Sequence, residues 1–344
     1  MQEMVAYENP WAAGPPPGEM TAVAPGVLWA RLPLRLAIDH VNVWALRDGD
    51  GWTIVDTGMH APATEEAWEG LFAGPLEGRP VIRVIVTHLH PDHVGMAGWL
   101  TKRFECELWM TELEYLAARD ATVRRDEVFE SSFREFFRAA GFTQDEVAQL
   151  QNSFASFGRY YHPLPEDYRR ICDGEQITIG EHEWSVIIGS GHSPEHACLL
   201  NPALGLLISG DQVLQRISSN VSVLPNQPAA NPLQNWLDSL DKLRSAVNDE
   251  VLVLPSHDLP FRGLHRRLHE LRAHHQVALA RLRDALDKPR RTAELFEVMF
   301  GRKIPARLTY LATGEAQSHL NYLLAAGLVS RHVDGDGVAW FQRC

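Results

Sequence analysis

Hydrophobic and polar positions alternate along this chain with two different periods. Short apolar runs rich in β-branched residues are typical of buried strands, and they occur at residues 25–34, 41–46, 52–58, 81–86, 105–110, 176–179, 183–188, 197–200, 205–208 and 250–254. Apolar residues that recur at every third or fourth position predict helices, and these occupy residues 63–72, 94–103, 232–247 and 263–286. Two blocks of strands, separated and followed by helices, together predict an α/β fold in which two packed sheets are covered by helices.

The segment between the two blocks of strands, residues 111–161, has a helical period throughout. It is rich in aromatic side chains, namely Phe129, Phe133, Phe136, Phe137, Phe142, Phe154, Phe157, Tyr160 and Tyr161. Two interpretations of this helical insertion remain open. It forms a lid that provides an apolar pocket for an acyl group, or its aromatic side chains simply pack the inserted helices together.

The C-terminal residues have a pattern of their own. The sequence KPRR at 288–291 is typical of a linker and predicts a division into domains at residues 1–287 and 288–344. Beyond it, three short helices are predicted within residues 292–328, and the turn DGDG at 334–337 predicts a hairpin. Three helices and a hairpin indicate a winged-helix-like domain.

Composition narrows the class of protein. Of the 344 residues, 45% are hydrophobic and 22% are charged, as in ordinary globular proteins. The N-terminal residues lack the pattern of a signal peptide, and no stretch approaches the ~20 consecutive apolar residues of a membrane helix. The four cysteines are scattered, without a disulfide-like or CxxC spacing. We therefore expect a reduced, cytoplasmic protein with no membrane partner, and a homodimer is left open.

Charge argues against nucleic acid as a partner. The formal net charge is −12, whereas phosphate contacts need a basic field. The helix predicted at 314–327 has no Lys or Arg and the turn at 334–337 is acidic, although a DNA-reading winged helix places polar or basic side chains at both positions. That helix instead carries an apolar stripe that must be buried, formed by Leu320, Leu323, Leu324 and Leu328. We expect the C-terminal domain to act in packing or pocket closure, and the partner to be a small-molecule substrate.

The sequence VTHLHPDHVG at residues 86–95 carries the most unusual chemistry of the chain. Its three histidines and one aspartate crowd into six positions directly after the predicted strand 81–86, where open α/β folds place their chemistry. Neutral imidazoles each need partners for one donor and one acceptor, and protonated imidazoles repel one another. A metal site accounts for the crowding, because the HxH pair can serve one ion and Asp92 with His93 can serve a second.

Two ions need further ligands, including a carboxylate that bridges them. Polar ligand types follow three later apolar runs, since His192, Asp211 and His257 each come directly after a predicted strand. We expect all three to meet the histidine cluster at one edge of the sheets. Histidine and carboxylate ligands suit zinc, and they also suit iron and manganese.

The motifs HLHPDH, GHSPEH, SGDQ and PSHD, preceded by VDTG at 55–58, resemble those of the metallo-β-lactamase superfamily in order and spacing. The resemblance covers roughly residues 23–287 and implies an αββα sandwich. The true β-lactamases of the commonest subclass have a cysteine in place of Asp211, so the similarity is greater to the glyoxalase II, lactonase and thioesterase-like members. The C-terminal domain resembles the winged helix of the subgroup that includes human β-lactamase-like protein 2.

The resemblance also implies roles for individual residues. The first metal would be bound by His88, His90 and His192, the second by Asp92, His93 and His257, with Asp211 as the bridge between two divalent ions. Asp56 would orient one of the ligand histidines. A hydroxide between the metals would attack the carbonyl of a small ester, thioester or lactone, with Asp92 and Asp211 as the catalytic carboxylates and Asp92 as a candidate proton donor.

Other polar residues near these motifs have open roles. The loop after Asp211 offers candidates for substrate contacts, namely Arg216, Ser218, Ser219 and Asn220. For Arg216, a structural ion pair is the alternative. We expect His196 to be a hydrogen-bonded neighbour and not a ligand, and we expect a solvated helix face for His265, His269, His274 and His275.

Three functions remain open at this point. The favoured one is a dinuclear, zinc-dependent hydrolase of small carbonyl substrates. A metal-dependent ribonuclease or other phosphodiesterase is the alternative, since the same metal pair supports both reactions. The third is a metal-bearing binding or redox protein, but the related flavodiiron proteins need a flavin domain, and no flavodoxin-like segment follows here.

Overall fold

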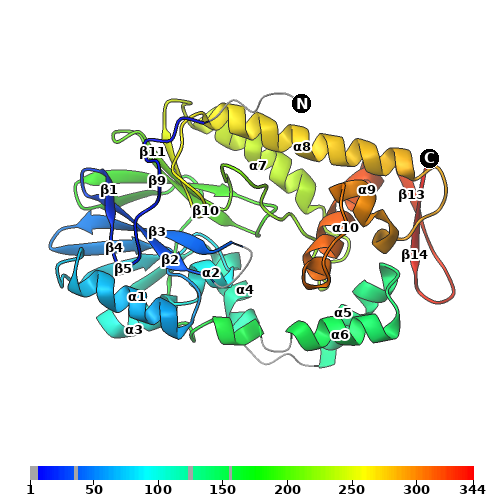
Figure 1. Cartoon of the computed structure of the whole chain (residues 1–344), viewed down its shortest axis with the longest axis horizontal. Helices are drawn as coiled ribbons and strands as arrows, with labels where there is room; N and C mark the ends of the chain where they lie inside the picture. Colours follow the sequence, from blue (N-terminus) through cyan, green and yellow to red (C-terminus); the bar gives the residue numbers. More distant parts are fainter. Residues whose placement is uncertain (1–6, 35–37, 123–126, 155–156) are drawn as a thin grey trace.

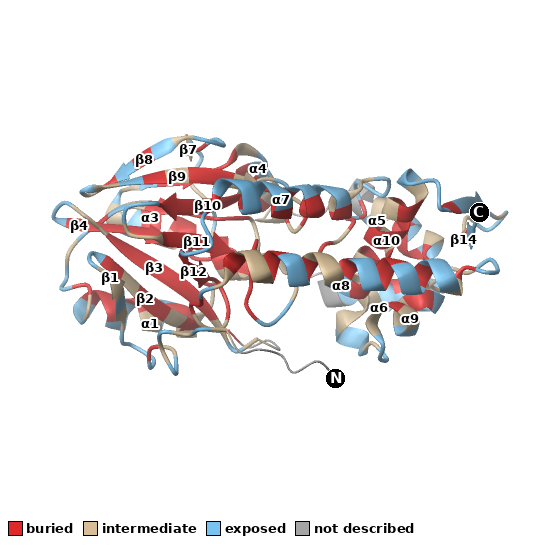
Figure 2. Cartoon of the chain, turned by 90° about the horizontal axis from the view of Figure 1, so that it is seen from above, coloured by how far each residue is buried: buried red, intermediate tan, exposed pale blue. Residues whose placement is uncertain are grey.

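The structure is a computed structural model that describes residues 7–34, 38–122, 127–154 and 157–344, without the side chains of 127–129 and 153–154. Two β-sheets stack face to face and helices cover both outer faces, so the protein has the predicted αββα architecture (Figure 1). A group of helices and a hairpin extends the sandwich along the long axis, and α8 (Leu264–Ala285) runs from one part to the other (Figure 2).

The first sheet contains seven strands in sequence order. They are β1 (Thr21–Ala24), β2 (Val27–Pro33), β3 (His40–Asp48), β4 (Gly51–Val55), β5 (Val81–Ile85), β6 (Glu107–Met110) and β7 (Arg169–Arg170). Strands β1 to β4 pair antiparallel, and β4 to β7 pair parallel. Because β4 and β5 run in the same direction, both end at the same edge of the sheet, where the Asp56 amide donates to the Ile85 carbonyl at 3.0 Å.

The second sheet contains five strands in the order β12-β11-β10-β9-β8. Their bounds are β8 (Gln176–Ile179), β9 (His182–Gly189), β10 (His196–Asn201), β11 (Leu206–Gly210) and β12 (Leu252–Pro255). Only β11 and β12 pair parallel. The sequence pattern missed β1 and β7; β7 has two residues, too few to show any period.

Helices close the sandwich on both sides. The first sheet is covered by α1 (Pro62–Ala73) and α3 (Ala97–Phe104), and the second by α7 (Pro232–Ala246) and α8 (Figure 1). The helix predicted at 94–103 is two helices, α2 (Pro91–Val94) and α3. The break occurs because the Met96 amide donates to the Gly58 carbonyl at 3.0 Å and so leaves the helical pattern.

Apolar side chains fill three layers. Trp29, Trp44 and Trp184 lie between the two sheets and are at most 1% exposed. Trp68 of α1 packs on the outer face of the first sheet, and Trp236 of α7 packs on the outer face of the second. The central strands of both sheets are therefore buried on both faces, which explains why they read as continuous apolar runs.

The helical insertion packs against the rest of the molecule. It consists of α4 (Glu112–Thr122), α5 (Glu127–Ala139), α6 (Gln144–Phe154) and the 3₁₀ turn η1 (Phe157–Tyr160). The buried side chains of Phe133, Phe136 and Phe137 form an apolar cluster with Val223 and Tyr310. This supports the interpretation in which the aromatic residues pack the inserted helices. Phe129 and Phe154 lie outside the described side chains.

The C-terminal residues form short helices and a hairpin, namely η2 (Thr292–Leu295), α9 (Phe296–Phe300), η3 (Ala306–Leu308), α10 (Thr309–Ala325), β13 (Val329–Val333) and β14 (Ala339–Arg343). The prediction that a helix begins at residue 314 is wrong, because α10 begins at Thr309 and passes through Gly314. A Cβ at Gly314 would lie 2.8 Å from Ser222, so the glycine permits close packing and does not end the helix. Leu320 of α10 and Phe341 of β14 share one core with Leu282 of α8.

The segment at 288–291 is tied to the hairpin. Arg290 and Phe341 exchange two backbone hydrogen bonds of 3.0 and 2.8 Å. The prediction of a buried apolar stripe on the helix expected at 314–327 holds for Leu320 and Leu323, which are buried. It is wrong for Leu328, which is 42% exposed. Leu328 follows Gly327, whose φ of 68° turns the chain away from the helix axis. The boundary at 287/288 and the winged-helix assignment stay predictions.

The expectation of a solvated histidine face on α8 is wrong for His275. His269 and His274 are exposed, but His275 is fully buried and its Nδ1 lies 3.1 Å from Nε2 of His319 on α10. His275 lies four residues after Leu271 and four before Leu279, and therefore on the apolar face of the helix.

Within the described part of the chain, no helix combines the length and the apolar composition that crossing a bilayer requires. The cytoplasmic location and the homodimer stay predictions.

Candidate metal centre

Polar side chains gather where strands of both sheets end. Asp56 directly follows β4, His192 lies in the loop after β9, Asp211 directly follows β11 and His257 lies two residues after β12. The cluster at 88–93 follows β5, and Pro91 begins the one-turn helix α2. The structure thus brings together at one edge the segments that the sequence predicts to meet there.

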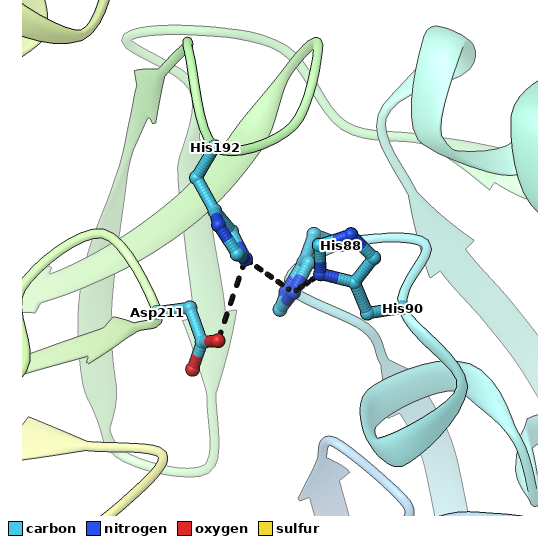
Figure 3. A group of neighbouring side chains, drawn as sticks. All are labelled: His88, His90, His192 and Asp211. Carbon is cyan, nitrogen blue, oxygen red and sulfur yellow. Dashed lines mark hydrogen bonds and ion pairs between the residues drawn. The ribbon is translucent and has the colours of Figure 1, made fainter. Parts of the chain in front are cut away.

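A first group contains His88, His90, His192 and Asp211, whose ligand-type atoms all lie within 4.8 Å of one another (Figure 3). Nε2 of His88 is 2.9 Å from Nδ1 of His90 and 3.3 Å from Nε2 of His192. Oδ2 of Asp211 is 3.4 Å from Nε2 of His192. One cation at the centre of this group would be within reach of three nitrogens and one oxygen.

A second group contains Asp92, His93 and His257. Oδ2 of Asp92 lies 3.5 Å from Nε2 of both histidines. The other oxygen of Asp211, Oδ1, lies 3.6 Å from Nε2 of His93 and 3.4 Å from Nε2 of His257. The two oxygens of Asp211 therefore face different groups, as a bridging carboxylate requires.

Backbone carbonyls fix the tautomers of two histidines. Nδ1 of His192 donates to the Asn220 carbonyl at 2.7 Å, and Nδ1 of His257 donates to the His40 carbonyl at 2.9 Å. A carbonyl can only accept, so Nδ1 carries the proton in both rings. Nε2 of a neutral ring then presents a lone pair to the centre of the site.

One carboxylate and one hydroxyl orient two further histidines. Asp56 accepts from Nδ1 of His93 at 2.9 Å and from the backbone amide of Thr87 at 2.8 Å. The Thr87 hydroxyl lies 2.9 Å from Asp56 Oδ2 and 3.0 Å from Nδ1 of His88. Asp56 thus acts directly on one group and, through Thr87, on the other. Its φ of 61° is uncommon for a residue other than glycine, and such strain is often found at functional sites.

The donor set fits divalent cations. Nε2 of His192 presents a lone pair 3.3 Å from Nε2 of His88, which in turn lies 2.9 Å from Nδ1 of His90, so three ring nitrogens converge where a cation could accept their lone pairs. His93 Nε2 and Asp211 Oδ1 are buried and have no hydrogen-bond partner among the described residues. Unpaired buried polar atoms are costly, and a bound ion is one of the few ways to satisfy them.

Burial and charge shift the pKa values of the two groups in different directions. Burial and the neighbouring His93 hold the pKa of His88 well below its usual range, and burial with His192 lowers the pKa of His90 to about 3. Burial also disfavours a proton on His257, but Asp211 outweighs it and raises the pKa of His257 to about 9. The first group favours neutral imidazoles, whereas the second attracts positive charge.

The profile of the metallo-beta-lactamase superfamily matches residues 37–257 of this chain. The chain belongs to this superfamily. A second profile, described as the metallo-beta-lactamase-like C-terminal domain, matches residues 279–344. Its match begins inside α8, the helix that joins the sandwich to the C-terminal residues.

A solved structure of a beta-lactamase domain protein from Burkholderia ambifaria is 40% identical, covers 98% of both chains and has a TM-score of 0.89. A curated hydroxyacylglutathione hydrolase of Hydrogenovibrio crunogenus is 29% identical over 119 residues, which are 35% of this chain and 38% of that protein. The acyl-coenzyme A thioesterase MBLAC2 of Gallus gallus is 24% identical over 239 residues, 67% of this chain and 77% of that protein. The matches to the first three curated relatives span 38% to 57% of their lengths.

His196 lies outside both ligand-type groups of this superfamily member. Its Nε2 accepts the backbone amide of Asp211 at 3.0 Å, so the ring helps to place Asp211. Gly210, with a φ of 53°, makes room for it, because a Cβ there would lie 2.4 Å from the His196 ring.

The predicted substrate residues have different surroundings. Arg216 is exposed and Ser218 is half-buried, its hydroxyl donating to the Ser219 carbonyl at 3.3 Å. The Ser219 hydroxyl donates to the Asp211 carbonyl. The Asn220 amide donates to Glu315 of α10 at 2.9 Å. Ser219 and Asn220 therefore make structural bonds, and Arg216 keeps the most accessible position of the four.

Sequence reasoning missed several residues that support the site. Thr87 had a recognisable signal, because it is the last residue before the histidine cluster. His40 acts through its backbone carbonyl, which no sequence pattern reveals. Glu114 lies 21 positions after His93 and Glu315 lies 58 positions after His257, and only the structure brings them near the site.

Proposed function

We propose that this protein is a dinuclear metal-dependent hydrolase that cleaves the carbonyl bond of a small ester, thioester or lactone. The observation that carries the proposal is the pair of ligand-type groups joined by Asp211, each of whose oxygens faces one group. Zinc is the first choice of metal for such nitrogen and oxygen donors, with iron and manganese as alternatives.

Two divalent cations, when bound, would polarise the substrate carbonyl and lower the pKa of water toward ~7. The side chains of the protein supply the geometry. Hydrogen bonds on the outer ring nitrogens hold the inner nitrogens in place, and the Asp211 carboxylate sets the separation of the two groups. Asp92 is the more exposed carboxylate, 17% against 10% for Asp211, and is the better placed of the two to carry a proton to the leaving group.

A side-chain nucleophile is not required by this arrangement. Cys198 is the cysteine closest in sequence to the His192 motif, and burial raises its pKa to about 12. Its thiol is therefore protonated at neutral pH and faces the protein interior. Attack by water agrees better with these features.

Thioesters are the first substrates to test. Of the two curated relatives named above, the one that matches more of this chain carries the name of an acyl-coenzyme A thioesterase. The net charge of −12 argues against long polyanions such as RNA. We therefore expect carbonyl substrates to be preferred over phosphodiesters.

The test is a hydrolysis screen on protein of measured metal content, with acyl thioesters, aryl esters, lactones and single-stranded RNA as substrates. We expect close to two metal ions per chain and turnover of at least one carbonyl class. Asp211→Ala should lose metal and nearly all turnover, whereas Asp238→Asn, an exposed carboxylate on α7, should change neither. At most trace metal in folded protein would refute the dinuclear site, and RNA cleavage faster than every carbonyl reaction would favour the phosphodiesterase alternative.

A further inference from the structure

Glu114 is a buried carboxylate that the mechanism above does not use. It lies in the first turn of α4, in the helical insertion, and its exposed fraction is 0%. Burying a charged group is costly unless hydrogen bonds compensate for the lost water. Its environment therefore has to provide donors.

The donors come from two different ligand-bearing loops. Oε2 of Glu114 accepts the backbone amide of Leu89 at 2.9 Å, and Oε1 accepts the backbone amide of Glu195 at 2.7 Å. Leu89 lies between His88 and His90, and Glu195 lies three residues after His192. One carboxylate thus joins the two loops that supply all three histidines of the first group.

The start of α4 is in turn fixed to the same loop. The Glu195 carboxylate accepts the backbone amide of Leu113 at 3.0 Å, one of the amides that a helix N-terminus leaves without a helical partner. The Thr111 hydroxyl donates to the Glu195 carbonyl at 2.8 Å. The Glu114 carboxylate therefore accepts a hydrogen bond from the His192 loop, and the Glu195 carboxylate of that loop accepts one from α4. As a result, α4 cannot shift without moving the His192 loop.

Tyrosine packing anchors the same helix on its other side. The Tyr115 hydroxyl donates to the carbonyls of Pro165 and Glu166 at 2.8 and 2.7 Å, and its ring stacks on Tyr168 at a centroid distance of 3.7 Å. The carboxylate next to Tyr115 is consequently held by a rigid support.

We propose that Glu114 is a positioning residue that sets the separation of the His88–His90 loop and the His192 loop, so that the three imidazoles converge on one cation. This inference rests on the proposed metal site. It gives the helical insertion a role in cation binding in addition to its packing. The role requires two acceptor oxygens on a side chain of this length, because each loop uses one.

A nearly isosteric substitution tests the role of Glu114. Glu114→Gln keeps the size of the side chain but replaces one acceptor oxygen with an amide donor, which then faces a backbone N–H. One of the two loops loses its hydrogen bond. Asp120→Asn, an exposed carboxylate on the same helix, is the matched control.

The experiment is a zinc titration of chelator-stripped protein at pH 8, in competition with a chromophoric chelator that resolves the two binding steps. A parallel cobalt titration reports the coordination geometry by its visible absorption. We expect Glu114→Gln to weaken one binding step by about 10–100-fold, the usual effect of removing a partner that orients a metal ligand, and to change the other step far less. The cobalt spectrum of the weakened site should change, and Asp120→Asn should match the wild type.

The outcomes separate this inference from the proposed function. A wild-type protein that binds no zinc refutes the metal site itself. A wild-type protein that binds two ions, together with unchanged affinities and cobalt spectrum in Glu114→Gln, refutes only the positioning role. Equal weakening of both steps also refutes it, since a general loss of structure has that effect. If Glu114→Gln does not fold, Thr111→Val removes a second hydrogen bond that joins the start of α4 to the His192 loop, the one to the Glu195 carbonyl. A smaller selective loss of zinc affinity is then expected, and no loss refutes the proposal.

Discussion

At the scale of single residues, the ring nitrogens that face away from the candidate site are as informative as those that face it. His192 and His257 donate to backbone carbonyls, and His93 donates to the Asp56 carboxylate. These bonds fix each ring without any contribution from a cation. The inner nitrogens are therefore held in position by the protein itself, which lowers the entropy lost on binding.

The neighbouring histidines His192 and His196 allow a direct test of which histidines are metal ligands and which only support the site. His196→Ala removes the acceptor for the Asp211 amide, and an unpaired buried amide costs about 1–3 kcal/mol of stability. Because His196 is not in either ligand-type group, we expect metal content to remain near that of the wild type. His192→Ala should lose metal, as measured by atomic emission after gel filtration. Equal loss from both variants would contradict the assignment.

At the scale of elements, α8 and α10 meet through a buried pair of histidines. Nδ1 of His319 donates to the Glu315 carbonyl at 2.8 Å, which leaves its Nε2 to accept from Nδ1 of His275 at 3.1 Å. Burial lowers the pKa of His319 to about 4, and burial together with His319 lowers the pKa of His275 to about 3. Both rings are neutral in the folded protein at physiological pH.

This pair makes stability fall as the medium becomes acidic. An unfolded histidine takes up a proton near pH 6.5, whereas the folded pair stays neutral until about pH 4. The two neutral rings therefore make their full contribution to stability above pH 6.5. This contribution is lost as the pH falls from 6.5 toward 4, and the loss at pH 5 is about 2 kcal/mol per ring.

Between pH 7 and pH 5, the free energy of unfolding of His275→Gln should fall by about 2 kcal/mol less than that of the wild type. The free energy of unfolding from urea titrations in the presence of chelator measures this difference. His269→Gln, an exposed histidine on the same helix, should keep the wild-type slope. An unchanged slope in His275→Gln would show that this ring is charged in the folded state.

Regular elements were more predictable from sequence than the contacts between them. The strand at 176–179 has the predicted bounds, because its apolar and polar residues alternate cleanly. Of the candidate site, the ligand types could be read from their positions after strands, since a strand end fixes where the next side chain lies. Thr87, the pair His275 and His319, and the contacts of Glu114 arise from packing between segments far apart in sequence, which no local period encodes.

At the scale of the whole molecule, the C-terminal residues complete both a core and a loop. Leu320 and Leu323 of α10 share an apolar core with Leu282 of α8. The Glu315 carboxylate accepts from the Asn220 amide at 2.9 Å, and the Asn220 carbonyl holds His192. α10 therefore reaches the candidate metal site through a single intermediate residue.

Deletion of residues 288–344 should lower stability and weaken cation binding together. It exposes the apolar side of α8 and removes the partner of Asn220. Thermal unfolding and zinc titration of the shortened chain measure the two effects. A deletion variant with wild-type Tm and wild-type zinc affinity would show that the C-terminal residues are independent of the sandwich.

The same packing argues against a nucleic-acid role for α10. Its buried residues include Gly314, His319 and Asn321, and Asn321 donates to the carbonyls of Pro228 and Ala230 at 3.0 and 2.7 Å. A helix enclosed in this way has no free face for a DNA groove. In gel-shift assays the intact protein should therefore show no salt-sensitive binding to duplex DNA, and steeply salt-dependent binding would overturn this view.

The distances along the chain between the contacts at the site have a consequence for the order of folding. His88 and His192 are 104 positions apart, and Asn220 and Glu315 are 95 apart. Closing loops of this size costs entropy before any contact repays it, so such contacts form late, after local helices and hairpins. On a ribosome, the His192 side of the site lacks its last support until α10 has emerged. Under the proposed function, cation uptake would follow folding and would not nucleate it, in contrast to small zinc domains that are unfolded without their metal.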